Sequence, residues 1–136
     1  MTSDRLARSY MEKATVRIKA LKFLHGEGGY SDVVREAQEC VELQLKGVLR
    51  CLGIEAPKIH DVSRVLHDKA ELLPESLRAH LDEVSRISRE LRKDRELAFY
   101  GTDDWIPTEE YSAEDSLEAI RKAERIYALV SQVIPS

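Results

Sequence analysis

Apolar residues recur at alternating intervals of three and four positions along most of the chain, which is the spacing of one face of an α-helix. The first such stretch begins near Ala7 and ends at the glycine-rich segment 26–29. The second follows Ser31, a candidate N-cap, and ends at Gly53, which suits a helix C-cap. The pattern predicts two long helices, and the second is expected to be buried on a wide face.

The same spacing continues after a connector at 56–58. A short helix is expected over about 61–72, because Pro74 cannot continue it. A further long helix is then predicted over 75–99, and Gly101 ends it.

Segment 102–111 has no helical period and is predicted to be a loop. Ser112 and Asp115 have the spacing of a capping box, and the apolar pattern of a last helix extends to Ile134. The connections are about four to ten residues long, which favours antiparallel neighbours. We therefore predict an all-α, up-and-down bundle of four long helices plus one short helix, in a single domain over 1–136.

Composition agrees with this fold and excludes several classes of function. The chain has 136 residues, of which 43% are hydrophobic and 34% charged, enough for one domain with its own core. Its net charge of −4 excludes a polycation that coats nucleic acid but leaves a local basic patch open. No apolar run approaches the ~20 residues of a membrane span. With no secretory signal at its start, the protein is expected to be cytoplasmic and to have no membrane partner.

The two cysteines are interpreted as small buried residues. Cys40 and Cys51 are eleven positions apart on one predicted helix, a rise of ~16 Å, whereas a disulfide needs Cα atoms within ~7 Å. They cannot bridge each other.

The apolar face of the predicted helix 75–99 is interrupted by two charged residues, Asp94 and Arg95. Charges near a buried face are costly unless paired, so these two either satisfy each other or face a groove. They lie in a basic stretch: Arg86, Arg89, Arg92, Lys93 and Arg95. Segment 103–118, in contrast, has seven carboxylates and no lysine or arginine. Two interpretations stay open, namely solvated helix faces or a phosphate-facing patch. The first helix is also basic, and Arg17 and its other cations are interpreted mainly as solubilising it.

Four segments together resemble the HEPN family, the small helical domains named for higher eukaryotes and prokaryotes nucleotide-binding. The sequence Arg-Lys-Asp-Arg-Glu-Leu-Ala-Phe-Tyr-Gly at 92–101 is similar to the family's motif segment. Segment 34–43 looks like its second helix, 57–62 like its connector and 105–115 like its last loop and helix start. The match covers almost the whole chain and points to the small, stand-alone prokaryotic or archaeal type.

The resemblance implies a helical bundle that forms a homodimer, with a cleft where the two arginine-containing segments approach. Many members are partners of small nucleotidyltransferases in toxin–antitoxin pairs. Ribonuclease members have an arginine, four to six residues and then a histidine, and they cleave RNA without metal, using the RNA's own 2′-hydroxyl. The arginine would stabilise charge on phosphorus and the histidine would move protons.

This chain departs from the ribonuclease pattern at Tyr100, which lies five residues after Arg95 where a histidine would be expected; the last histidine is His80. A phenol with a pKa of ~10 is a poor substitute for an imidazole near 6.5. Three roles of Tyr100 stay open: its hydroxyl orients a phosphate, it accepts a nucleotidyl group from a partner enzyme, or it is a buried aromatic.

The leading hypothesis is a binding module rather than an enzyme. Its ligand-binding residues are Arg92, Lys93, Asp94, Arg95 and Tyr100. They would contact a nucleotide, an RNA phosphate or a nucleotidyltransferase partner, with Asp94 holding the guanidinium of Arg95. The alternative is a metal-independent endoribonuclease with Arg95 and Tyr100 as catalytic residues and His60 brought close by folding. A third is a purely structural interaction protein.

Two further features are weaker. His60 and Asp61, with His25 and either Asp82 or Asp94, resemble on paper the ligand set of the HD metal phosphohydrolases. Asp61 is better interpreted as the N-cap of the short helix, and we expect neither a metal nor a cofactor. Trp105 and Pro107 are candidates for covering the cleft or for a dimer contact.

Overall fold

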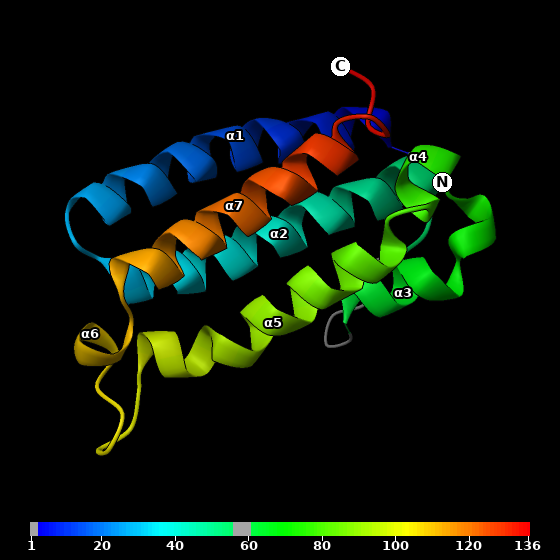
Figure 1. The fold of residues 1–136 in the computed structure, drawn as a ribbon. Helices are drawn as coiled ribbons and strands as arrows, with labels where there is room; N and C mark the ends of the chain where they lie inside the picture. Colours follow the sequence, from blue (N-terminus) through cyan, green and yellow to red (C-terminus); the bar gives the residue numbers. More distant parts are fainter. Residues whose placement is uncertain (1–2, 56–60) are drawn as a thin grey trace.

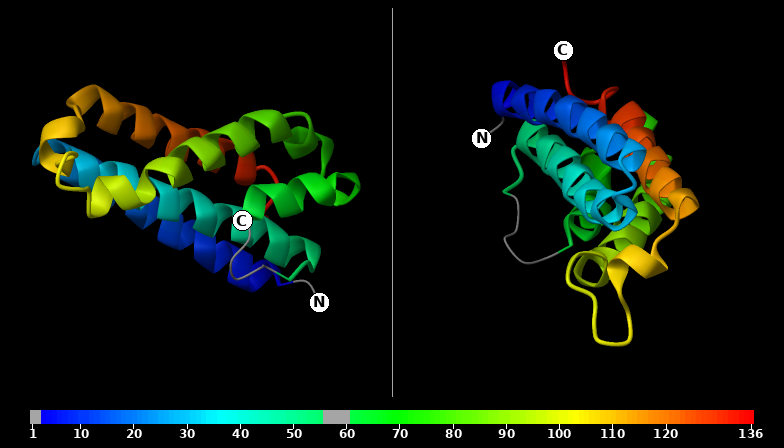
Figure 2. Two further views of the ribbon diagram at one scale, coloured as in Figure 1. Left: turned by 90° about the horizontal axis from the view of Figure 1, so that it is seen from below. Right: turned by 90° about the vertical axis from the view of Figure 1, so that its left-hand side faces the viewer.

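Four long helices form the body of the protein. The computed structural model describes residues 3–55 and 61–136. The long helices are α1 (Asp4–Gly26), α2 (Tyr30–Leu52), α5 (Leu81–Phe99) and α7 (Ala113–Val130). Successive long helices run in opposite directions, and α2 lies at the centre, in contact with the other three (Figures 1 and 2). The described residues contain no β-strand, so the prediction of an all-α bundle is confirmed.

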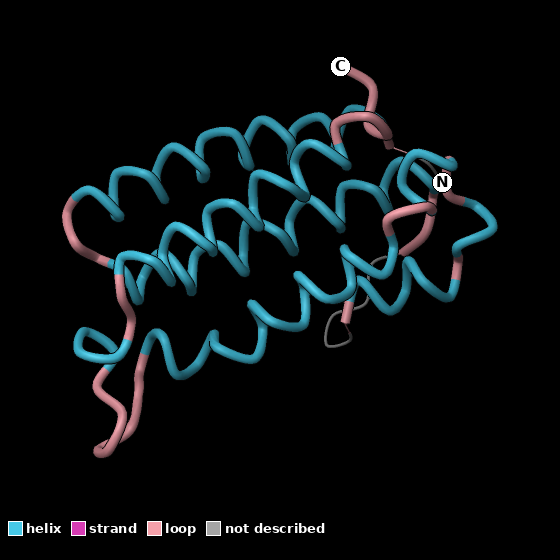
Figure 3. Tube along the Cα trace, viewed as in Figure 1, coloured by secondary structure: helices cyan, strands magenta, loops and turns pink. Residues whose placement is uncertain are grey.

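Short elements join the long helices at the two ends of the bundle (Figure 3). At one end, α3 (Val62–Asp68), a 3₁₀ turn (Ala70–Leu72) and α4 (Glu75–Arg78) connect α2 to α5. At the other end, α6 (Pro107–Glu110) lies between α5 and α7. The predicted loop 102–111 therefore contains one helical turn.

Several predicted caps are confirmed. Asp61 begins α3 by accepting a hydrogen bond from the Ser63 amide at 3.0 Å. Gly53 ends α2 in the left-handed conformation, with φ 72°. Ser112 and Asp115 form the reciprocal capping box of α7.

Other boundaries differ from the prediction. The helix expected over 75–99 is divided at Ala79 and His80, because His80 leaves the helical conformation with φ −115° and ψ 15°. Gly29, rather than Ser31, is the N-cap of α2. The Gly29 amide donates to the Leu24 carbonyl at 2.8 Å, so the tight turn from α1 sets this start. The last helix ends at Val130, although its apolar pattern continues to Ile134.

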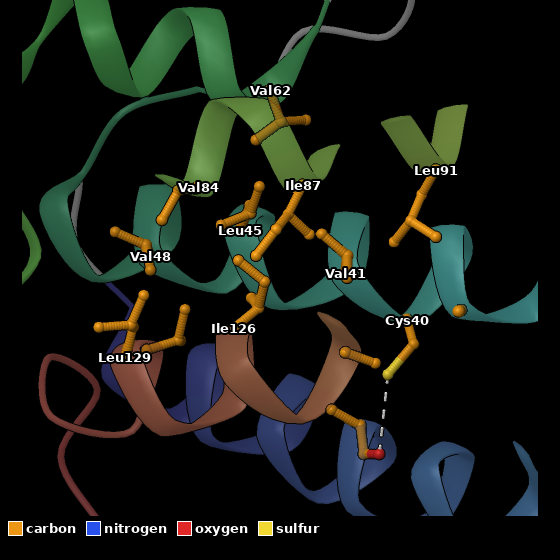
Figure 4. Packing of buried hydrophobic residues seen from close by; sticks show 14 of the residues in the cluster. Cys40, Val41, Leu45, Val48, Val62, Val84, Ile87, Leu91, Ile126 and Leu129 are labelled. Atoms are coloured by element: carbon orange, nitrogen blue, oxygen red, sulfur yellow. Dashed lines mark hydrogen bonds between the residues drawn. The ribbon is translucent and has the colours of Figure 1, made fainter. Parts of the chain in front are cut away.

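The core lies along α2, whose wide face is buried between α1, α5 and α7 (Figure 4). Gly47 allows a close approach there, since a Cβ at this position would lie 3.0 Å from the Ile134 side chain. Cys40 is buried and donates to the Ala14 carbonyl, whereas Cys51 is only partly buried. Both are free thiols, and burial raises the pKa of Cys40 to about 11. No described helix is both long and apolar enough to cross a membrane.

Candidate anion site between α1, α2 and α5

Arg95 lies near the C-terminal end of α5 and faces α2. Its Nη2 donates to the Glu39 carboxylate at 3.3 Å, and its side chain is 42% exposed. The described residues show no ion pair between Arg95 and Asp94, so the expectation that Asp94 holds this guanidinium is wrong. Consecutive residues of a helix do not face each other. Asp94 instead lines a separate pocket beside α7.

Glu39 is the centre of a group of three arginines. Its carboxylate lies 3.5 Å from Arg35 and 3.9 Å from Arg17, in addition to Arg95. Glu36 also contacts Arg35, at 2.8 Å, and Arg17, at 3.6 Å. We call Arg17, Arg35 and Arg95 the arginine cluster. It joins three helices, and Arg17 therefore does more than solubilise α1.

Two aromatic side chains lie beside the arginine cluster. The Arg35 guanidinium is 4.2 Å from the centre of the Phe99 ring, a cation–π geometry. The Phe99 and Tyr100 rings pack edge to face with centres 4.6 Å apart. Tyr100 is 74% exposed and Phe99 46%, so the interpretation of Tyr100 as a buried aromatic is wrong. Gly101, with φ 67°, turns the chain directly after this pair.

A surface cavity of about 320 Å³ lies at this junction, lined by Arg17, Ala20, Leu24, Asp32, Glu36 and Phe99. The arginine cluster and its two glutamates carry one excess positive charge, which Asp32 offsets. An anion that binds here must therefore take guanidinium donors from the carboxylates. Exposed arginine and aromatic groups side by side are the combination that recognises a phosphate and a stacked base.

The remaining predicted ligand-binding residues do not converge on this point. Arg92 lies one turn before Arg95 on α5, but its Nη2 is 2.6 Å from Asp61 at the start of α3. Burial acts to raise the pKa of Asp61, but hydrogen bonds from Ser63 and Arg92 outweigh it and hold that pKa below its ordinary value. Lys93 is exposed and makes no ion pair within the described residues.

The residues that resemble the ligand set of the HD metal phosphohydrolases make other contacts. His25 hydrogen-bonds Ser116 through Nδ1 at 2.9 Å, and Asp82 lies 3.5 Å from His67. His60 lies outside the described residues. Within residues 3–55 and 61–136, no group of three or more histidine, cysteine or carboxylate side chains is placed to hold a metal ion.

Sequence reasoning missed the α2 half of the site. Arg35, Glu36 and Glu39 belong to the segment that resembles the family's second helix, yet only folding shows that they meet Arg95. The spacing of Arg35 and Glu39 is that of an ordinary surface pair on one helix. No sequence signal distinguishes them from such a pair.

The sequence profile of the HEPN domain family matches residues 7–133, which is nearly the whole chain. The protein therefore belongs to the HEPN domain family, as the motif segments predicted. Comparisons with curated proteins and with solved structures found no match. Membership supports a nucleotide- or RNA-related module in general.

Proposed function

We propose that this HEPN domain binds a nucleotide or RNA phosphate at Arg95, as the partner of a small nucleotidyltransferase in a toxin–antitoxin type of pair. The observation that carries the proposal is the half-exposed Arg95 guanidinium in the arginine cluster, next to the exposed Phe99 and Tyr100 rings. Within the described residues Arg95 uses one donor, on Glu39. A guanidinium has five N–H donors, so a phosphate that displaces the carboxylate can accept from more than one of them.

Binding would proceed by exchange at the guanidiniums. A phosphate replaces the Glu39 carboxylate as the partner of Arg95, and charge-assisted hydrogen bonds compensate for the lost ion pair. Tyr100 then offers a ring face for a base or a hydroxyl for a phosphate oxygen. Its exposure also leaves the hydroxyl accessible to a partner enzyme that transfers a nucleotidyl group.

The family membership further supports a homodimer, in which two copies of the arginine cluster face one cleft. Light scattering of the purified chain tests this part separately. We expect twice the mass of the 15.5 kDa chain, and a monomer at high concentration would contradict it.

The ribonuclease alternative has less support in the structure. The described histidines contact other residues: His25 contacts Ser116, His67 contacts Asp82 and His80 contacts Glu83. None of these contacts brings an imidazole to Arg95. RNA cleavage that persists with a chelator and disappears in Arg95→Ala would establish the alternative.

The test of phosphate binding is a titration of a labelled nucleotide and a short RNA into wild type and Arg95→Ala. Arg89→Ala is the matched control, because Arg89 is an exposed arginine on the same helix but outside the arginine cluster. Removal of a charge-assisted hydrogen bond should weaken binding about tenfold or more in Arg95→Ala and little in Arg89→Ala. Equal affinity in wild type and Arg95→Ala would contradict the proposal.

A further inference from the structure

A second pocket is lined by residues of α2, α5 and α7 and by residues of the segment 105–111. This segment lies at the end of the bundle where α6 leads into α7 (Figure 1). Its volume is about 270 Å³. Its apolar lining comes from Val34, Leu91 and Ala119, which are all buried core residues. The proposed phosphate site does not use this pocket.

The polar lining of the pocket is strongly acidic. It comprises four carboxylates and one lysine: Asp94, Glu110, Asp115, Glu118 and Lys122. The lysine does not balance them, because its Nζ lies 2.7 Å from Glu90 and its side chain is only 17% exposed. Within the described residues Asp94 and Glu110 make no ion pair. The pocket therefore has an excess of negative charge.

Aromatic side chains complete the pocket. The rings of Trp105 and Tyr111 pack edge to face with centres 6.3 Å apart. The Tyr111 hydroxyl is buried and has no well-formed hydrogen bond within the described residues. Asp94, Trp105, Tyr111 and Asp115 all line this pocket. Burial and the charges of Asp94 and Asp115 raise the pKa of Tyr111, against the effect of the Trp105 side chain.

We propose that this pocket, defined by Asp94, Glu110, Trp105 and Tyr111, binds an arginine side chain from a basic segment of a partner protein. A guanidinium makes paired hydrogen bonds to carboxylates and stacks on aromatic rings, and tryptophan is the best ring for this contact. The volume lies below the range of about 300–1,000 Å³ for drug-sized ligands and suits one side chain. The negative charge repels phosphate groups.

A protein fits this surface better than a free small cation. Trp105 is 37% exposed and the adjacent Ile106 is 41% exposed, so apolar surface continues beyond the charged residues. Arginine and tryptophan are enriched among the residues that dominate protein–protein binding energy. This proposal does not rest on the phosphate site, because the two surfaces share no residue.

Trp105 provides a direct readout, because it is the single tryptophan of the chain. The probe is the tripeptide acetyl-Ile-Arg-Ile amide, and its matched control replaces arginine with the neutral isostere citrulline. Titration should change the Trp105 fluorescence with a Kd of roughly millimolar, as expected for a single anchoring residue. The citrulline peptide should bind at least about tenfold more weakly. Equal binding of the two peptides would overturn the proposal.

Variants locate the binding site. Asp94→Asn combined with Glu110→Gln should weaken binding of the arginine tripeptide about fivefold. Glu109→Gln is the matched control, because Glu109 is an exposed neighbour outside the pocket. Circular dichroism checks the fold of the double variant, and Asp94→Asn alone replaces it if it does not fold. Unchanged affinity in the folded variant would overturn the assignment.

Two comparisons distinguish this proposal from the binding of a free small cation and from the proposed phosphate site. Agmatine has the same guanidinium without a peptide, and it should bind more weakly than the arginine tripeptide. Equal or tighter agmatine binding would overturn the assignment to a partner protein and indicate a free small cation. Arg95→Ala should bind the tripeptide like wild type, so failure of the phosphate site and failure of this pocket give different results.

Discussion

Neutralisation of Glu39 is expected to strengthen anion binding at the arginine cluster. Glu39 contacts Arg95, Arg35 and Arg17 at 3.3, 3.5 and 3.9 Å, so its carboxylate occupies the donors that a phosphate needs. Glu39→Gln keeps the size of the side chain and removes its charge. The three guanidiniums then lose the carboxylate that competes with the anion for their donors.

The magnitude follows from the exposure of these side chains. Two unit charges about 4 Å apart attract by ~4 kcal/mol at an effective dielectric constant of about 20. Glu39 is 31% exposed and Arg95 is 42% exposed, so solvent screening reduces each pair to roughly 0.2–1 kcal/mol. Three such pairs lead us to expect a gain of about 1 kcal/mol in anion binding, or about fivefold in Kd. The free energy of unfolding should fall by a similar amount.

Equilibrium titration of a labelled nucleotide measures the first effect and urea denaturation the second. Glu42→Gln is the matched control, because Glu42 lies on the same helix and contacts Gln38 and Lys46 instead. Its anion affinity should stay at the wild-type value. Equal or weaker anion binding by Glu39→Gln would refute the idea that Glu39 competes with the ligand.

Three further predictions concern stability, each measured by urea denaturation. Leu45→Ala should lower the free energy of unfolding by about 3 kcal/mol, because Leu45 is fully buried; a loss below 1 kcal/mol would contradict the packing. Gln44→Leu should raise it by about 1 kcal/mol, since the buried Gln44 Oε1 has no partner in the described structure; a clear loss would indicate that the amide is well bonded. Asp61→Asn should lower the free energy of unfolding by about 1 kcal/mol at pH 7, because it removes the ion pair with Arg92 while preserving the N-cap. The lowered pKa of Asp61 stabilises the fold above the ordinary carboxyl pKa, and this stability is lost as the pH falls through the folded-state pKa. The difference from wild type should therefore shrink as the pH is lowered below the ordinary carboxyl pKa, and a constant difference would exclude the Asp61 charge as its cause.

The long helices could be predicted from the sequence because a helix that is buried on one face has apolar residues at intervals of three and four positions. Ala7, Met11, Ala14, Ile18 and Leu21 form such a stripe, and all five are buried in α1. The break between α4 and α5 at Ala79 and His80 could not be detected in this pattern, because Leu77 and Leu81 are both buried and keep helical spacing across it. Periodicity reports which side chains face the core and not whether the backbone is continuous.

The candidate site was only half predictable for a related reason. Arg95 was found because it interrupts an apolar stripe, and its side chain is 42% exposed and paired with Glu39. Its partner Glu39 is 56 positions away, so only the packing of α2 against α5 reveals the pair. The pairing with Asp94 was wrong because neighbours in sequence point to different sides of a helix.

If the Arg95 guanidinium is open to a phosphate, its side-chain NMR resonance should report the binding. In a ¹H–¹⁵N spectrum, assigned with Arg95→Lys and Arg89→Lys, a nucleoside monophosphate is added stepwise. The Nε–H resonance of Arg95 should shift and saturate, while that of Arg89 stays in place. An unmoved Arg95 resonance under conditions where the nucleotide binds elsewhere would contradict phosphate binding at Arg95.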